Sequence, residues 1–348
     1  MTATVDIQPF SLPLETEFRT AGGIITERNG FFIRIDSGAG TGIGEATPLP
    51  GWTEGRSVCH NALRRFQKQS EVTDPWEIQL DEGSPAARHG ITLAMFDAAA
   101  QAEDESLGHY LQGSPVPERI PVHATIGDSP VIETVEQACQ AIDEGFQAIK
   151  VKVGRQSPSN DCSRIQALRA ELGEHIRIRL DANREWDLPT AREVCTVARQ
   201  EGVEYIEEPL AQPTNESIDT LRAIGVPIAA DETLIDSATN HDLDPLSFDV
   251  FILKPMALGG IDMTISMAAD VQRRGIDVVI SNTIDGRVAR TAAAHIAGIV
   301  APENPAGLAT EGLFDSNSRD GSRDIQNGRF VLPAGPGIGV HGDWIDSP

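Results

Sequence analysis

The chain has 348 residues, of which 40% are hydrophobic, and 52 Asp and Glu against 28 Lys and Arg give a formal net charge of −24. This length can hold one large domain or two with a sizeable core, and the composition is typical of a globular rather than a disordered protein. The acidic surplus excludes a nucleic acid as a favourable partner, because phosphates would be repelled, and the sequence has no apolar run of about 18 residues that could span a membrane.

Residues 1–115 are predicted to form an α+β domain that caps the rest of the chain. The run "GFFIRIDS" (30–37) alternates like an antiparallel strand, and "GITLAMFDAAAQA" (90–102) is typical of a helix. The segment "GTGIGEATPLPGW" (40–52) is rich in turn-forming residues and is interpreted as a loop. We expect the second part of this loop, "GEATPLPGW" (44–52), and the segment "TEFRTAGG" (16–23) to close over an active site and choose the substrate.

From about residue 120, short β-rich runs alternate with amphipathic helical stretches such as "IETVEQACQAIDEGF" and "IDMTISMAADVQRRG". The β-rich runs cover residues 120–126, 148–153, 176–183, 203–209, 227–233, 249–255 and 277–282, with a final short run at 306–310. Alternating strands and helices imply parallel pairing, and this number of units indicates a closed barrel. Residues 116–310 are therefore predicted to form a modified (β/α)7–8 barrel. An open doubly wound sheet is the alternative, although no G-x-G-x-x-G turn follows the first strand.

The C-terminal segment, residues 311–348, departs from this alternation. It is rich in Gly, Asp and Pro, which favour turns over regular elements. We expect this tail to return along the molecule and pack against the capping domain.

Several features of the sequence indicate the cellular environment. The N-terminus, "MTATVDIQPF", lacks the basic and apolar regions of a signal peptide. The four cysteines are scattered, without metal-ligand or disulfide-rich spacing: Cys59, Cys139, Cys162 and Cys195. We therefore expect a reduced, cytoplasmic setting. The dispersed acidic surplus and the scarcity of lysine resemble halophilic proteins, in which salt screens the self-repulsion.

Acidic side chains recur at the carboxyl ends of consecutive predicted strands. Asp181, Glu207, Asp231 and then Lys254 follow one another at intervals of 23 to 26 residues, about one strand–helix unit each. In a barrel these ends converge on one mouth, where active sites are built. Three carboxylates brought together repel unless a cation joins them, and oxygen ligands on rigid strands suit Mg²⁺ or Mn²⁺. Any one of these acids could be a helix N-cap, but their regular recurrence favours a metal site.

Other polar side chains at the same strand ends are candidates for substrate contact or support. Asn183 lies two residues after the first acid and can support it or cap a helix, while Ser281 and Asn282 end the last long strand. Only one of Glu207 and Glu208 can enter the mouth, because neighbours on a strand face opposite ways. The histidines show no ligand spacing and are interpreted as structural.

Lys150 and Lys152 lie two residues apart in the apolar run "AIKVKVG", so their ammonium groups point the same way. The chain has only four lysines, three of them in apolar segments, which indicates a role for lysine chemistry. Crowded by Lys150 and withdrawn from water, Lys152 is expected to have a depressed pKa and to act as a neutral base. Lys254 would enter from across the barrel. A metal between lysines suits removal of a proton next to the carboxylate of a small-molecule substrate.

Together these motifs resemble the enolase superfamily, and within it the muconate-lactonizing-enzyme subgroup. The resemblance covers nearly the whole chain and rests on the K-x-K pair, "LDAN", "IEEP", "ADET", "LKPMALGG" and the late "GPGIGV". It implies a barrel with a capping domain and lysine-plus-Mg²⁺ chemistry. The family's metal ligands fall on Asp181, Glu207 and Asp231, and its acid/base lysines fall on Lys152 and Lys254.

Within that subgroup, "GIGEATPLPGWTEG" (42–55) is similar to the o-succinylbenzoate synthase pattern, in which G-W-G-E precedes P-L-P-G-F. The chain has Ile43 in place of that Trp and Trp52 in place of that Phe, and "SNTIDG" (281–286) departs from the family's serine-rich segment in its second, fifth and sixth residues. The resemblance implies dehydration of 2-succinyl-6-hydroxy-2,4-cyclohexadiene-1-carboxylate to 2-succinylbenzoate, a step of menaquinone biosynthesis, with Lys152 as the base.

Other functions remain open from the sequence. An N-succinylamino acid or dipeptide racemase would use Lys152 and Lys254 as opposed bases, although no D-x-D of the dipeptide-epimerase kind occurs near residues 306–312. A muconate-type cycloisomerase would use the same lysines and metal. A metal-free Schiff-base lyase would use Lys254 as nucleophile but leaves three carboxylates unexplained. A non-catalytic binding barrel is the alternative of a different class, and assembly into a homo-oligomer stays open.

Overall fold

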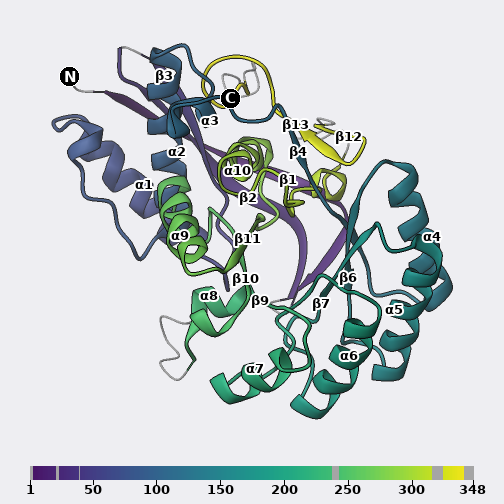
Figure 1. Cartoon of the computed structure of the whole chain (residues 1–348). Coiled ribbons are helices and arrows are strands. Elements are labelled where there is room, and N and C mark those ends of the chain that lie inside the picture. Colours follow the sequence, from purple (N-terminus) through teal and green to yellow (C-terminus); the bar gives the residue numbers. More distant parts are fainter. Residues whose placement is uncertain (1–2, 21–22, 39, 237–242, 316–323, 341–348) are drawn as a thin grey trace.

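The computed structural model describes residues 3–20, 23–38, 40–236, 243–315 and 324–340. It has two parts: a small antiparallel sheet with helices at the N-terminal side, and a curled parallel sheet whose helices lie on its outside (Figure 1). The predicted fold class, a modified barrel with an α+β capping domain, is confirmed. None of the helices in the described ranges combines the length and apolar character that crossing a bilayer requires.

The N-terminal part is built on a three-stranded antiparallel sheet in the order β1-β2-β3. Its strands are β1 (Thr4–Thr20), β2 (Gly23–Asp36) and β3 (Thr41–Ala46). Its helices are α1 (Arg56–Ser70), η1 (Pro75–Glu77), α2 (Pro85–Ala102) and α3 (Leu107–Gln112). Alternation in β2 places Phe31, Ile33 and Ile35 in a core shared with α1 and α2. The segment 16–23, predicted to be a loop, instead forms the end of the β1–β2 hairpin, apart from residues 21–22, which lie outside the described residues.

The prediction of a loop over residues 40–52 was wrong in its first half, because residues 41–46 form β3. The glycines that suggested turns serve close packing instead. A Cβ on Gly42 would lie 2.0 Å from the backbone oxygen of Ala94, and one on Gly44 would lie 1.8 Å from that of Gly90. Only glycine therefore lets α2 lie directly on this strand.

The second part is a seven-stranded sheet in the order β11-β10-β9-β8-β7-β6-β5, with every neighbouring pair parallel. The strands are β5 (Ala124–Ile126), β6 (Ala148–Lys152), β7 (Arg177–Asp181), β8 (Tyr205–Glu207), β9 (Ile228–Ala230), β10 (Val250–Leu253) and β11 (Asp277–Ile280). The intervening helices are α4 (Val131–Asp143), α5 (Pro158–Leu172), α6 (Leu188–Gln200), α7 (Asn215–Arg222), α8 (Glu232–Asp236), η2 (Pro245–Ser247), α9 (Ile261–Arg273) and α10 (Arg287–Val300). The predicted strands are thus found in order, each shorter than its β-rich run.

Two residues close the gap between the edge strands of this sheet. Ala306 forms a parallel bridge with Val122, just before β5, and Gly307 forms one with Ser281, just after β11. The predicted run at 306–310 therefore completes the barrel with isolated bridges rather than with a full strand. The closing segment leads to η3 (Glu311–Leu313).

The C-terminal tail contacts both parts of the molecule. Its strand β13 (Arg329–Val331) pairs antiparallel with β12 (Ile325–Gln326) on one side and, on the other, with β4 (Arg119–Pro121) at the start of the barrel. Further along, Gly337 bridges Ser106, and the backbone N–H of Ile338 donates to the Asp97 carboxylate at 2.6 Å. The tail thus ties the capping helices to the barrel, while the limits 1–115, 116–310 and 311–348 remain a prediction.

The last barrel helix, α10, receives its N-terminal cap from the other part of the molecule. Its own N-cap residue, Gly286, offers no side chain. The buried Glu45 carboxylate on β3 accepts from the backbone N–H of Gly286 at 2.7 Å and of Ala289 at 3.0 Å. A carboxylate at a helix N-terminus satisfies free donors and complements the helix dipole, so Glu45 fastens the capping domain to the barrel.

A buried histidine on α10 gives the fold a dependence on pH. His295 accepts from the N–H of Gly108 at Nδ1 and contacts the carbonyl of Ile338 through Nε2, each at 3.3 Å. Because the carbonyl can only accept, Nε2 carries the proton and the ring is neutral. Burial lowers the pKa of His295 to about 4. The unfolded chain therefore binds a proton between about pH 6.5 and pH 4 that the folded chain does not.

We expect this difference to lower the free energy of unfolding by about 3 kcal/mol as the pH falls from 7 to 4. His295→Gln cannot titrate, so its stability should depend less on pH over that window. Urea unfolding of both proteins at several pH values measures the difference. Substitution of the exposed His175 by Gln serves as the control and should leave the dependence unchanged. Equal pH dependence in the wild type and His295→Gln would contradict the assignment.

Candidate active site

The carboxyl ends of five neighbouring strands bring the predicted acids and lysines together. Lys152 ends β6, Asp181 ends β7 and Glu207 ends β8, and these three residues are partners in register across the sheet. Asp231 and Lys254 directly follow β9 and β10. Parallel register therefore converts a regular spacing in the sequence into a row of charged groups along one edge.

Each lysine of this row contacts a carboxylate. The Nζ of Lys152 donates to Asp181 Oδ2 at 2.6 Å, and that of Lys254 donates to Asp231 Oδ2 at 2.6 Å. Lys150 lies between two acids, 2.9 Å from Asp181 Oδ2 and 3.1 Å from Glu207 Oε1. All three carboxylates are buried. The site is thus an alternation of positive and negative groups largely withdrawn from water.

These contacts alter the expected role of the lysine pair. Repulsion between Lys150 and Lys152 was expected to tune the base, but a single oxygen of Asp181 contacts both ammonium groups. Burial alone would lower the pKa of Lys150, yet the carboxylates of Asp181 and Glu207 together raise it well above its ordinary value. Lys150 is therefore a stable cation that holds the acids together, and repulsion between the lysines is offset.

Two properties of the carboxylates indicate that a further cation would stabilise the row: the raised pKa values of two of them, and an oxygen of Asp231 that has no partner. Burial raises the pKa of Glu207 to about 8, with the charge of Asp181 adding to the effect, and it raises the pKa of Asp231 to about 6. Burial would also raise the pKa of Asp181, but the ammonium groups of Lys150 and Lys152 outweigh it and lower that pKa. Oδ1 of Asp231 is buried without a hydrogen-bond partner, which is costly unless another group satisfies it.

The donor set, the burial and the unpartnered oxygen of Asp231 all fit a hard divalent cation. The described ranges nevertheless contain no group of three His, Cys, Asp or Glu side chains already spaced to hold a metal ion. Lys150 donates to both oxygens of Glu207, at 3.1 and 3.2 Å. Ligation by all three acids would therefore require this ammonium to shift.

Asn183 links the base to a fourth carboxylate. Its Oδ1 accepts from Lys152 Nζ at 2.8 Å, and its Nδ2 donates to Glu232 Oε1 at 3.1 Å. Its backbone has a φ of +42°, a left-handed conformation that is uncommon outside glycine. Oε2 of Glu232 is buried without a partner, and burial raises the pKa of Glu232. Asn183 thus lies between the Lys152 ammonium and the Glu232 carboxylate.

Ser281 and Asn282, predicted to support the site or contact the substrate, both bond to the closing segment in this structure. The Oγ of Ser281 and the Nδ2 of Asn282 both donate to the carbonyl of Gly307, at 3.3 and 2.9 Å. Oδ1 of Asn282 accepts from the backbone N–H of Ile284 and Asp285. These bonds hold the closing segment against the end of β11.

Sequence reasoning missed the role of Glu208. Its Oε1 accepts from the backbone N–H of Asp231 at 2.8 Å and of Thr233 at 2.7 Å. Its Oε2 accepts from Arg184 Nε and from the hydroxyl of Thr233. Glu208 therefore faces away from the row and fixes the backbone that carries Asp231. The adjacent acids in "IEEP" were the available signal, because only one of them can enter the mouth.

Arg164, on α5, is a second supporting residue that the sequence did not reveal. Its fully buried guanidinium donates to the carbonyls of Lys152 and Gly127, each at 2.9 Å, at the ends of β6 and β5. It also pairs with Asp161 at 3.0 Å, which accepts from the N–H of Gly154. Helical spacing was the available signal, because Arg164 shares a face with the buried Leu168 and Leu172.

The loop that follows β3 reaches the same mouth. The ammonium of Lys254 lies 3.5 Å from the centroid of the Trp52 ring. Trp52 belongs to the second part of the loop predicted to close over the active site. The capping domain therefore contributes a side chain directly beside one of the two predicted acid/base lysines.

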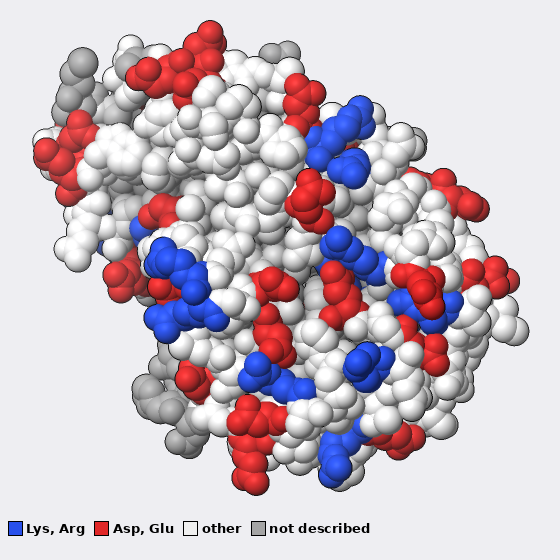
Figure 2. Space-filling view, viewed as in Figure 1, with Lys and Arg blue, Asp and Glu red and all other residues white. Residues whose placement is uncertain are grey.

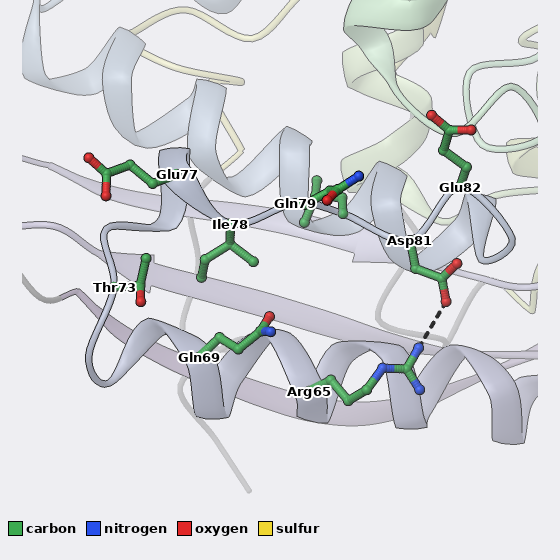
Figure 3. Close-up of a pocket in the computed structure, with 9 residues that line it drawn as sticks. Arg65, Gln69, Thr73, Glu77, Ile78, Gln79, Asp81 and Glu82 are labelled. Carbon is green, nitrogen blue, oxygen red and sulfur yellow. Dashed lines mark hydrogen bonds and ion pairs between the residues drawn. The ribbon is translucent and has the colours of Figure 1, made fainter.

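One cavity lies away from this row. It has a volume of about 690 Å³ and runs between α1 and the segment that follows η1, where Arg65 pairs with Asp81 at 2.9 Å (Figure 3). A second cavity of about 380 Å³ lies at the opposite ends of the barrel strands, beside Tyr205, Val250 and Asp277. None of the predicted site residues lines either cavity. The cluster of charged side chains at the strand ends therefore locates the candidate active site, whereas these two cavity volumes do not.

Residues 133–345 match the family model described as "Enolase C-terminal domain-like". An o-succinylbenzoate synthase of Thermobifida fusca (strain YX) is 33% identical over 249 residues, 69% of this chain and 74% of the relative. Chloromuconate cycloisomerase CbnB of Cupriavidus necator is 26% identical, covering 97% of this chain and 94% of the relative. The crystal structure of a dipeptide epimerase from Cytophaga hutchinsonii, complexed with Mg and the dipeptide D-Ala-L-Val, has a TM-score of 0.84 at 25% identity over 99% of this chain and 98% of that chain.

We expect Glu208→Gln to lower the free energy of unfolding by about 2 kcal/mol, measured by urea denaturation. The amide nitrogen that replaces one carboxylate oxygen cannot accept a hydrogen bond, so donors at Asp231, Thr233 or Arg184 lose their partner. Substitution of the exposed Glu193 on α6 by Gln is the control and should change stability by less than about 0.5 kcal/mol. Equal free energies of unfolding in the two variants would show that the Glu208 contacts do not stabilise the fold.

Proposed function

Because the chain belongs to the enolase superfamily, we propose that its barrel mouth is the active site of an o-succinylbenzoate synthase. The substrate would be 2-succinyl-6-hydroxy-2,4-cyclohexadiene-1-carboxylate, and the products would be 2-succinylbenzoate and water, a step of menaquinone biosynthesis. The similarity to the Thermobifida fusca synthase supports this choice. So does the loop over residues 42–55, which is similar to the synthase pattern.

The observation that carries the proposal is the unequal environment of the two lysines. The Lys152 side chain is 31% exposed and contacts Asp181 and Asn183. The Lys254 side chain is 11% exposed and lies between the Asp231 carboxylate and the Trp52 ring. A dehydration that takes and returns one proton on one face needs a single mobile base and a fixed positive charge. A racemase needs two lysines that both transfer protons.

In the proposed reaction Lys152, once neutral, removes the proton from the ring carbon that carries the carboxylate. The carbon–oxygen bond to the ring hydroxyl then breaks, and Lys152 gives its proton to the departing oxygen, so that water leaves and the ring becomes aromatic. Lys254 offers a fixed positive charge near the negative charge that develops on the substrate. Asn183 orients the Lys152 ammonium through its 2.8 Å contact.

We further propose that Asp181, Glu207 and Asp231 hold Mg²⁺ or Mn²⁺. Their burial, and the unpartnered oxygen of Asp231, support this assignment. The related dipeptide epimerase was crystallised with Mg. A divalent cation at this position would supply positive charge that stabilises the carboxylate end of the substrate as its neighbouring proton leaves.

A second candidate is a racemase or epimerase that acts on an N-succinylamino acid or a dipeptide. The likeness to the Cytophaga hutchinsonii epimerase favours it, and so does the position of both lysines beside carboxylates of one row. A muconate-type cycloisomerase has support from the relative in Cupriavidus necator. A non-catalytic barrel is disfavoured, because burying so many charged groups is costly and binding alone does not require it.

We also propose that the protein works at high salt. Acidic side chains occur over most of the face drawn in Figure 2 rather than in one patch, in keeping with the net charge of −24. Such dispersed charge repels itself, and salt screens the repulsion.

We expect activity to vanish on chelation with EDTA and to return with Mg²⁺ or Mn²⁺, because three buried carboxylates need a cation. Asp231→Asn should weaken Mg²⁺ binding at least about tenfold by calorimetry. Asp277→Asn, at the exposed opposite end of β11, should leave binding unchanged. Full activity in metal-stripped protein would refute the metal assignment.

We expect the two lysines to respond differently to arginine, which cannot be deprotonated in a protein. Lys152→Arg should lower both dehydration and α-proton exchange by about 10⁴-fold. Lys254→Arg keeps the charge, so measurable dehydration and exchange should remain. Deuterium incorporation from D₂O and formation of 2-succinylbenzoate are the measurements.

Lys68→Arg, on the exposed surface of α1, is the matched control and should behave as the wild type. The synthase proposal fails if the wild type efficiently racemises an N-succinylamino acid and forms no aromatic product. Loss of exchange in Lys254→Arg equal to that in Lys152→Arg would favour a two-base racemase.

A further inference from the structure

Lys254 is restrained from two sides. Asp231 accepts a hydrogen bond from its ammonium at 2.6 Å, and the ring centroid of Trp52 lies 3.5 Å from the same nitrogen. A cation over an indole face is attracted by the ring quadrupole, and Trp attracts more strongly than Phe or Tyr. Within the described ranges, Lys254 is the only lysine found over an aromatic ring.

A tight turn presents Trp52. Its backbone N–H donates to the carbonyl of Leu49 at 2.9 Å. The hydroxyl of Thr53 accepts from the N–H of Leu49 at 2.8 Å. Between them, Gly51 has a φ of +98°, which residues with a side chain rarely adopt. The indole thus comes from an ordered turn of defined geometry, not from an extended loop.

This turn is braced against the barrel by Arg28. Its buried guanidinium donates to the carbonyl of Thr47 at 2.7 Å and of Pro48 at 3.2 Å, just before the turn. It also donates to the carbonyl of Ile284, in the loop after β11, at 3.0 Å. The position of Trp52 therefore depends on the docking of the capping domain onto the barrel.

A lysine on a flexible four-carbon stem needs more than one contact to fix its position. The carboxylate restrains its distance from Asp231 but leaves the ammonium free to pivot, and an error of about 1 Å in a reacting group can cost a hundredfold in rate. We propose that Trp52 is a positioning residue that fixes the ammonium of Lys254, so that docking of the capping domain completes the charged row. The inference deepens the proposed function and rests on it.

The scarcity of lysine makes the contact directly measurable. Protein labelled with ¹³C-lysine gives resonances from only four residues: Lys68, Lys150, Lys152 and Lys254. The ring current of Trp52 should shift the ε-methylene protons of Lys254 upfield of the other three, and Trp52→Leu should remove this shift. Trp76→Leu, which removes an exposed indole of the capping domain, is the control and should leave the four resonances unchanged. A shift that persists in Trp52→Leu would overturn the proposal whatever reaction the protein catalyses.

Kinetics separate positioning from a merely structural role. We expect Trp52→Leu to lower kcat about tenfold with little change in KM, and Trp52→Phe to retain most of the rate. In a Lys254→Met background, Trp52→Leu should reduce the remaining α-proton exchange no further, because its target is gone. Equal losses in both backgrounds would overturn the proposal, as would a raised KM with unchanged kcat, which would make Trp52 a substrate contact.

The proposed function and the positioning role of Trp52 can each be refuted without the other. If neither the cyclohexadiene carboxylate nor an N-succinylamino acid exchanges its α-proton, the proposed function is wrong, and the lysine resonances still decide whether Trp52 fixes Lys254. If exchange occurs but Trp52→Leu leaves both the resonances and kcat unchanged, the function stands and the positioning role is refuted. Thermal unfolding of the Trp52 variants shows whether each is folded.

Discussion

The structure depends on the neutralisation of buried carboxylates at one edge of a parallel sheet. Asp181, Glu207 and Asp231 leave water when the barrel forms, and each requires an opposite charge or a donor to offset that loss. The register of β6, β7 and β8 sets them side by side, while Lys150 and its neighbours supply the positive charge. The same ammonium groups therefore both permit the burial of the acids and set the charge of the row.

A layer of residues behind this row keeps it in place, and its members bind the backbone more than one another. Glu208 accepts from the amides that follow β9, and Arg164 donates to carbonyls at the ends of β5 and β6. Arg28 and Glu45 act in the same way between the capping domain and the barrel. Buried polar networks whose donors and acceptors are satisfied rigidify a core and specify one arrangement of it. They give the charged row a rigid support.

Much of the barrel could be predicted, because alternating strands and helices and recurring acids at strand ends are local patterns. The supporting residues could not, since which carbonyl a buried arginine such as Arg164 meets depends on packing between distant elements. The glycines of β3 predicted a turn that does not form. Gly42 and Gly44 instead allow α2 to approach the strand closely. Lys150 and Lys152 do share one strand, but the sequence does not show that a carboxylate offsets their repulsion. Repulsion between neighbours is visible in the sequence, whereas the oxygen of Asp181 that contacts both is visible only in space.

The cap that Glu45 provides for α10 bears on how such a protein can change over evolutionary time. A barrel inherited without this partner would begin its last helix with unsatisfied amides, since Gly286 supplies no side chain of its own. Recombination that exchanged capping domains between relatives would have to preserve a carboxylate at this point of β3, or acquire a new N-cap in the barrel. Replacement of the capping domain would therefore change the start of a barrel helix as well as the loop that carries Trp52, and the two parts also share buried core residues.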